Sequence, residues 1–275
     1  MMRRLLVICA VFFTLTSWAQ ERYTCIPFSD RKVFDADEVL SFGISYKWGA
    51  VNTEVATARI AVENTKLGKE TLFHSDVTAR TAPFFDVFFK IREHFEGWFQ
   101  PKTLRPEKSV RDTHEGTYAA YNRFQYDWDE RIIHAYVERT SHGERNLEIP
   151  LVDCVCDVPS LVFCLRQMDV SKMDIGKPYG LHFAIDDTIF QISLINMGKE
   201  TVKVKGMGQV RCNYLRCTVV KGAMFQGDED VKIWLSDDGN QVPVAFWAPL
   251  RVGAMKGTLK AHENLLYPMT SVISK

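Results

Sequence analysis

Hydrophobic and polar residues alternate one by one along most of this chain. The first segment with this pattern is the clearest, since single small or polar residues separate Leu40, Phe42, Ile44, Tyr46 and Trp48. Alternate side chains of a β-strand point to opposite faces of the sheet. The segment therefore predicts a strand with one apolar face and one small, polar face.

The same alternation recurs further along the chain and predicts about thirteen strands in all. The further strands are expected at residues 55–63, 70–79, 90–99, 118–126, 131–139, 179–185, 188–196, 201–205, 209–220, 231–236, 242–247 and 252–262. Most connections between them are short and contain Gly, Asp, Asn or Pro, which favours hairpins over crossover helices. We therefore expect an antiparallel arrangement.

One segment departs from the alternation. Residues 159–168 are evenly apolar, and Pro159 followed by Ser160 suits the start of a helix. We expect a short buried helix there, with Asp157 as its N-cap and Arg166 paired with a carboxylate of the sheet. Residues 83–89 contain four phenylalanines and are compatible with either a helical turn or an aromatic strand.

The predicted elements belong to an all-β protein with one short helix. Many strands with one polar face imply a sheet that curls around a core, either as a barrel or as a two-sheet sandwich. We favour a large antiparallel curled sheet, or half-open β-barrel, because too few helices are predicted to cover an open sheet. A single β-rich domain is expected over residues 20–275, with halves 20–150 and 151–275 meeting near residues 150–159.

The first residues have a different character. Residues 1–19 begin at Met1, carry Arg3 and Arg4 before an apolar run, and end on a small-x-small site at Ala19. This is the layout of a cleaved secretory signal peptide. The apolar run is shorter than the roughly 18 residues that a membrane span needs. We therefore predict a periplasmic or secreted protein whose mature form has no membrane span.

Two further observations limit the partners of the mature chain. Neither Cys9 nor Cys25 stands in the context of a lipoprotein signal, so no lipid anchor is expected. Two of the 34 basic residues lie in the signal, which leaves 32 basic against 34 acidic residues and a net charge of −2. Phosphate backbones are bound by clustered Lys and Arg, so nucleic acid is not an expected partner.

Six cysteines follow the signal, and an oxidising compartment permits disulfides among them. They are Cys25, Cys154, Cys156, Cys164, Cys212 and Cys217. Cys154 and Cys156 face the same side of an extended segment and are badly placed to bridge each other. A bridge from either one to Cys164, Cys212 or Cys25 is one interpretation, and packing as small apolar side chains is the other. Cys212 and Cys217 face opposite sides of a strand unless a bulge intervenes.

Motifs that would carry chemistry are absent from the sequence. The seven histidines are scattered singly, without the spacing of a metalloprotease helix, and the cysteine pair lacks neighbouring ligands for zinc. Nucleophile elbows and glycine-rich phosphate loops are also missing. Asp186-Asp187 and Asp237-Asp238 are paired carboxylates that suit turns. We predict no catalytic residue, no metal and no cofactor, and favour a protein that is not an enzyme.

The order and spacing of four segments resemble an uncharacterised family of exported bacterial envelope proteins, catalogued as domain of unknown function 3108, over about residues 35–262. The segments are Glu38-x-Leu40, Phe124-Gln125-Tyr126-Asp127, Asp157-x-Pro159-Ser160-Leu161 followed by Arg166, and Trp234-Leu235-Ser236-Asp237 with Pro243, Val252-Gly253 and Leu259. The resemblance implies an antiparallel fold similar to the curled sheets of periplasmic lipoprotein carriers, and an exported location. It implies no activity, and the cysteines are not part of its pattern.

Export, aromatic-rich strands and the missing catalytic motifs favour a non-enzymatic binder or carrier of an apolar or amphipathic ligand, such as a lipid or glycolipid. The residues singled out as ligand-binding candidates are Asp157, Arg166, Trp234, Phe85 and Phe88. One alternative is a structural or assembly factor that binds an envelope protein along a strand edge or through residues 84–89. Another is a hydrolase acting on envelope glycan or lipid, with Asp157 or Arg166 as the residues to test.

Overall fold

The computed structural model describes residues 24–220, 230–250 and 252–274, and within them the chain forms one 16-stranded β-sheet and one α-helix. The expected signal peptide, residues 1–19, lies outside the described residues. The first half of the chain contains β1 (Val39–Trp48), β2 (Val51–Leu67), β3 (Glu70–Thr81), β4 (Ile91–Phe99), β5 (Pro106–Glu115), β6 (Tyr118–Asp127), β7 (Ile132–Arg139) and β8 (Gly143–Pro150).

The second half contains the helix and the other strands. They are β9 (Val155–Asp157), α1 (Val158–Gln167), a short 3-10 turn η1 (Val170–Lys172), β10 (Pro178–Ile185), β11 (Thr188–Val204), β12 (Gly208–Val220), β13 (Val231–Ser236), β14 (Pro243–Pro249), β15 (Ala254–Glu263) and β16 (Val272–Ser274). Each half of the chain therefore forms one meander of the same sheet. That residues 20–275 make up a single domain stays a prediction.

The sheet follows the order of the chain almost strand by strand. It runs from β8 back to β1, continues from β1 into β15, and then runs back from β15 to β9, while β16 pairs with β12. All pairs are antiparallel except β9 with β10. Because β8 and β9 are neighbours in the chain but stand at opposite ends of this order, the sheet has to curl.

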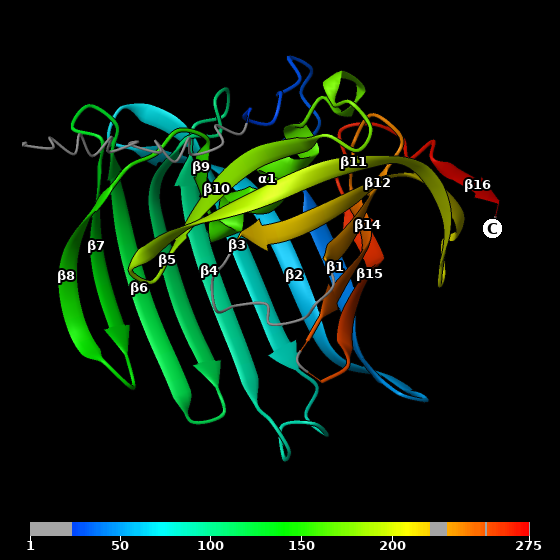
Figure 1. Ribbon diagram of the computed structural model, residues 1–275, viewed down its shortest axis with the longest axis horizontal. Coiled ribbons are helices and arrows are strands. Elements are labelled where there is room, and N and C mark those ends of the chain that lie inside the picture. Colours follow the sequence, from blue (N-terminus) through cyan, green and yellow to red (C-terminus); the bar gives the residue numbers. More distant parts are fainter. Residues whose placement is uncertain (1–23, 221–229, 251, 275) are drawn as a thin grey trace, which may run out of the picture.

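The curl brings the second meander across the inner face of the first. In Figure 1, β10 and β11 pass in front of β4 and β5, with α1 between the two layers. β9 also contacts β5 across the interior. The edges at β8 and β9 do not pair with each other, so the sheet stays open. The prediction of a curled, half-open antiparallel sheet is confirmed, and the two-sheet sandwich is wrong.

The helix lies inside the curl and fills one end of it. Asp157 caps α1 by accepting from the backbone of Ser160, whose hydroxyl completes a capping box, and Pro159 lies in the first turn. The ring of Phe163 packs 4.6 Å from Phe34 and 5.4 Å from Phe99, centroid to centroid. The predicted helix and its cap are confirmed, and this end of the interior is a packed aromatic core.

Four strands were not expected from the sequence: β5, β8, β9 and β16. β5 lacks apolar alternation because the residues that it buries after Pro106 are polar, Ser109 and Thr113. β8 is an edge strand with mostly exposed side chains.

Two segments differ in form from the expectation. Residues 188–196 and 201–205, expected as two strands, form the single strand β11 with a bulge between Asn196 and Lys199. Residues 83–89 form turns, not a strand.

Candidate functional site

The inner face of the sheet becomes less buried with distance from α1. In the row of residues beneath the helix, Phe73 is 2% exposed and Phe99 is 0% exposed. Two rows further along β3 and β4, Val77 and its cross-strand partner Phe95 are only half-buried. Ala79, in the next row, is half-buried as well. The helix therefore covers one end of the inner face and leaves apolar side chains at the other end partly open.

The second meander contributes apolar residues of the same kind. β13, β14 and β15 place half-buried side chains against the core clusters that surround α1 and β1. Ile60 of β2 packs against both clusters and so links the two sides. We define the inner apolar face as Ala58, Ile60, Val77, Ala79, Phe95, Val231, Ile233, Phe246 and Met255.

A charged network borders the inner apolar face at β4, β5 and β7. Arg111 Nη1 lies 2.8 Å from Asp186 Oδ1, and Arg139 Nη1 lies 3.6 Å from Asp186 Oδ2. Asp186 belongs to the β10–β11 turn, where its φ is +53°. The network therefore fastens the tip of this hairpin to the inner face of the first meander. The expectation that Asp186 is a turn residue is confirmed, and the structure adds its ion pairs with Arg111 and Arg139.

The network continues to a buried carboxyl group. Arg111 Nε donates to the hydroxyl of Thr113 at 2.8 Å, and this hydroxyl donates to Glu93 Oε2 at 2.6 Å. Burial raises the pKa of Glu93 to about 7, and the neighbouring charge of Glu115 adds to the effect. A carboxyl group in this range exchanges protons near neutral pH. We define the inner polar cluster as Glu93, Arg111, Thr113, Arg139 and Asp186.

Apolar and polar groups meet directly on adjacent strands. Glu93 is the cross-strand partner of Ala79, and Arg111 is the cross-strand partner of Phe95. Directly paired residues of an antiparallel sheet share a face. Two buried polar atoms of the cluster, Glu93 Oε1 and Arg139 Nε, have no hydrogen-bond partner. The inner surface is therefore amphipathic and has an unused acceptor and an unused donor at its polar end.

The outer surface carries a different concave region. A groove of about 790 Å³ lies over β5 to β8, and it is lined about equally by polar side chains such as Arg123 and Glu148 and by apolar ones such as Leu67 and Leu147. Its lining does not resemble the mostly apolar lining that is typical of sites for apolar ligands. We therefore take the inner face, and not this groove, as the candidate site.

The structure places the predicted residues Asp157 and Arg166 in the core. Asp157 is 0% exposed, and its Oδ2 atom has no partner and faces Gly97, where an added Cβ would lie 3.0 Å away. Arg166 is also 0% exposed and forms an ion pair with Glu38, which confirms its pairing with a carboxylate at the start of the sheet. Both side chains support α1 and lie out of reach of a substrate.

The other predicted residues lie elsewhere. Trp234 is on the opposite face of β13 from Ile233, stacks on Tyr214 at 5.3 Å, and donates to Glu200. Phe88 is 76% exposed in the turn between β3 and β4, where Phe85 is half-buried. The five residues singled out from the sequence therefore do not form one site.

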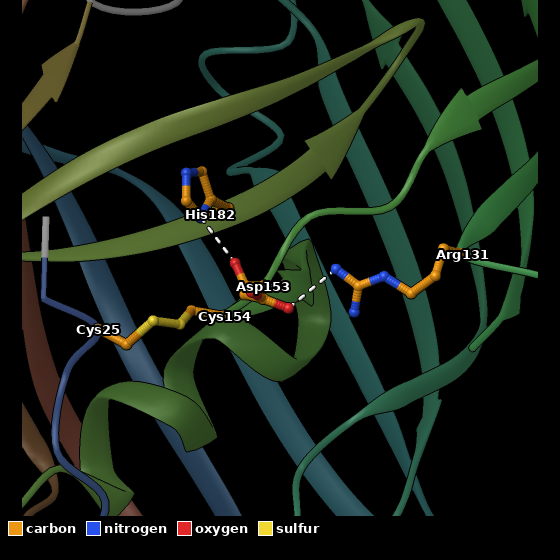
Figure 2. The surroundings of a disulfide bond; sticks show 5 residues. All are labelled: Cys25, Arg131, Asp153, Cys154 and His182. Atoms are coloured by element: carbon orange, nitrogen blue, oxygen red, sulfur yellow. Dashed lines mark hydrogen bonds and ion pairs between the residues drawn. A yellow bond between two sulfur atoms is a disulfide. The ribbon is translucent and has the colours of Figure 1, made fainter. Parts of the chain in front are cut away.

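One disulfide joins Cys25 to Cys154, with 6.1 Å between their Cα atoms, and ties the N-terminal segment to the loop before β9 (Figure 2). The carbonyl of Asp153 in this loop accepts from Nδ1 of His182. The other disulfide candidates are buried free thiols: Cys156, Cys164, Cys212 and Cys217. Cys154 has a φ of +56°, so the extended geometry expected around it does not hold.

Sequence reasoning missed the inner polar cluster. A signal for Glu93 is present, because it shares a strand face with Phe95 by alternation and is an ionisable residue at an inward position. Arg111 and Thr113 lie in β5, which was not predicted, and Asp186 reaches them only through the curl of the sheet. The Arg111 and Asp186 side chains come together across 75 residues of chain.

Comparisons with known proteins relate the chain to one family of unknown function. A family model described as "Protein of unknown function (DUF3108)" matches residues 41–260. No curated protein matches the chain. Among solved structures, the crystal structure of a beta-barrel-like protein of domain of unknown function DUF1849 from Brucella abortus is 11% identical, covers 90% of this chain and 100% of its own, and has a TM-score of 0.48. Among the described residues, no helix has the length and hydrophobicity to cross a membrane.

Proposed function

This chain belongs to the DUF3108 family, whose description assigns no activity, and we propose its function from the properties of the inner face of the sheet. The protein binds an apolar or amphipathic ligand, such as a lipid or glycolipid, without catalysing a reaction. The proposal includes a location in the periplasm or outside the cell, which the signal-peptide pattern of residues 1–19 supports. The ligand's apolar part lies on the inner apolar face and its polar part at the inner polar cluster.

The observation that carries this proposal is the loss of burial along the inner face beyond α1. Ligand sites are mostly apolar and contain a few well-placed polar groups. Val77, Ala79 and Phe95 supply the apolar part, and each methylene group that a ligand buries there contributes about 0.8 kcal/mol. Arg111, Arg139 and Asp186 lie beside them with partly exposed side chains, and these charged groups suit the polar head of an amphipathic ligand.

We expect Ala79→Trp to lower binding of a dansyl-labelled fatty acid at least about tenfold, measured by fluorescence titration. Ala79 is half-buried on the inner face and pairs with Ala58, so a tryptophan there occupies space that the acyl chain would use. Loss of contact with two methylene groups costs about 1.6 kcal/mol, or roughly tenfold in affinity. Arg80→Trp is the matched control, because Arg80 is exposed on the opposite face of the same strand.

Protein purified from its own envelope is the second test, by organic extraction and mass spectrometry. A lipid recovered with the wild type and depleted in Ala79→Trp supports the proposal. Equal probe binding by Ala79→Trp and the wild type would contradict it. So would the absence of any co-purified lipid together with a wild type that does not bind the probe.

A second candidate function is docking of a partner protein of the envelope, and one observation favours it. The turn between β3 and β4 exposes Phe84 by 73%, Val87 by 85% and Phe88 by 76%. The turn is anchored, since Arg92 Nη1 donates to Asp86 at 3.0 Å and the hydrogen bond from Arg92 lowers the pKa of Asp86 to about 2. Exposed apolar clusters of this kind mark interaction sites.

For this second function, Phe88→Asp is expected to abolish a crosslinked adduct formed in cells and to leave stability within about 0.5 kcal/mol of the wild type, because the ring is exposed. Val252→Asp is the control, since Val252 is also an exposed apolar residue, 57% exposed, outside this turn. An adduct of unchanged yield in Phe88→Asp would exclude the turn as the docking surface.

A further inference from the structure

The outer face of β3 and β4 carries a compact group of histidines and carboxylates, on the side of the sheet opposite the inner apolar face. Asp76 of β3 and Glu96 of β4 are direct cross-strand partners, and His94 of β4 lies next to them. One ligand atom from each of these three residues lies within 4.8 Å of the others. His94 Nε2 is 2.8 Å from Asp76 Oδ2.

Apart from His94 and His74, which contact Asp76 and Glu96, the cations of the described residues compensate the charges of this group poorly. Like charges directly opposite each other on adjacent strands are destabilising. Arg59, the cation paired with Asp76 in the described part of the chain, stands 3.9 Å from it, and both side chains are partly exposed, so the pair contributes little. A divalent cation between Asp76 and Glu96 would neutralise both carboxylates.

We propose that Asp76, His94 and Glu96 bind a divalent transition metal, with Zn²⁺ as the best-fitting ion. One imidazole and two carboxylates are a donor set that zinc accepts, at metal–ligand distances of about 2.0–2.2 Å. Tetrahedral zinc therefore places its ligand atoms about 3.3 Å apart. The three donor atoms already lie within 4.8 Å of one another, so small side-chain rotations bring them to this spacing.

His74 is the positioning residue of this site. Its Nε2 lies 3.1 Å from Glu96 Oε1, its Nδ1 lies 3.1 Å from Glu63 Oε1, and its ring stacks on Trp98 at 4.5 Å. Groups that orient metal ligands through hydrogen bonds tune metal affinity by about 10–100-fold. His74 holds the Glu96 carboxylate in place and is itself fixed by the stack.

Three protein ligands leave one position of a tetrahedral ion for water or a small anion. His74 and Asp76 also line a groove of about 430 Å³, together with Asp37, Arg59 and Asn264. The free position therefore has room for an exchangeable ligand.

A second group, Asp127, Glu130 and His134, has comparable spacing but a different local role. Asp127 Oδ1 already accepts from the backbone nitrogens of Asp129 and Glu130, at 3.0 and 2.8 Å. This carboxylate therefore shapes a turn, and a metal would compete with its hydrogen bonds. His134 serves as the matched control for His94.

The test is titration of the untagged, metal-free chain with ZnCl₂ by isothermal calorimetry, and with Co²⁺ by visible absorption. We expect one Zn²⁺ per chain, and a loss of affinity of at least about tenfold in His94→Ala and in Asp76→Asn. His134→Ala should bind as the wild type does. His74→Ala should weaken binding without moving the Co²⁺ absorption bands, because the ligand set is unchanged.

Three results would overturn the proposal: no Zn²⁺ binding by the wild type at millimolar metal, unchanged affinity in both His94→Ala and Asp76→Asn, or loss of binding in His134→Ala alone. The four substituted residues, His74, Asp76, His94 and His134, all have at least partly exposed side chains, and asparagine has nearly the same shape as aspartate. Circular dichroism is therefore expected to show that each variant is folded.

Discussion

Glu38→Ala is expected to lower the free energy of unfolding by about 3–5 kcal/mol, because it leaves a buried guanidinium without its counter-charge. Arg166 is 0% exposed and Glu38 is 2% exposed, and Arg166 Nη2 lies 2.9 Å from Glu38 Oε2. The same guanidinium donates to the carbonyls of Val33 and Asn240 and stacks over Phe34 at 5.3 Å. One side chain thus joins the N-terminal segment, α1 and the β13–β14 connection.

Urea denaturation followed by tryptophan fluorescence measures this effect. Asp35→Ala is the matched control, because Asp35 pairs with Lys32 at 2.6 Å while both side chains are 44–49% exposed, and exposed pairs contribute at most about 1 kcal/mol. The double variant Glu38→Leu/Arg166→Met should recover much of the loss, since it removes both charges. A loss below about 1 kcal/mol in Glu38→Ala would show that the pair does not support the fold as described.

The second large effect is a pH-dependent stability that comes from Asp157. Burial raises the pKa of this carboxyl group from 3.8 to about 7, although hydrogen bonds from Ser160 oppose the shift. The native state therefore holds a proton between about pH 4 and pH 7 that the unfolded chain has released, so stability falls as the pH rises through this range. The slope is about 1.4 kcal/mol per pH unit, which amounts to about 4 kcal/mol over the whole window.

Asp157→Asn tests this expectation. The amide keeps an oxygen that can accept from Ser160 and cap α1, but it does not ionise. The free energy of unfolding of Asp157→Asn minus that of the wild type should therefore increase from pH 5 to pH 7 and then level off. Glu93, whose pKa is also raised to about 7, is present in both proteins and cancels in this difference.

Asp86→Asn is the control for the pH series. The hydrogen bond from Arg92 lowers the pKa of Asp86 to about 2, and the reference value is 3.8, so both values lie below pH 5. Its stabilising contribution is lost only as the pH falls toward 2, and the difference from the wild type should be constant from pH 5 to pH 8. A constant difference for Asp157→Asn as well would contradict a buried, proton-binding Asp157.

Local patterns predicted the elements whose side chains follow the usual alternation. The strand expected from Leu40 to Trp48 is β1, and the helix expected over residues 159–168 is α1, with Asp157 as its cap. These features depend on residues a few positions apart, which the chain brings together by its own backbone geometry. β5 escaped prediction because its inward side chains, such as Thr113, are polar.

The tertiary fold, and with it the candidate site, follows from contacts between distant parts of the chain. The Glu38 and Arg166 side chains meet across 128 residues, and the Cys25–Cys154 disulfide spans 129. The amphipathic inner face likewise exists only because the second meander curls over the first and sets Asp186 against Arg111.

The sequence by itself determined the strands that alternate apolar and polar residues, such as β1, and the position of the helix and its cap, since these are set by neighbouring residues. Only the tertiary structure decided which inward side chains α1 covers and which stay half-buried. Burial depends on what packs against a side chain from elsewhere in the chain, and alternation carries no information about that.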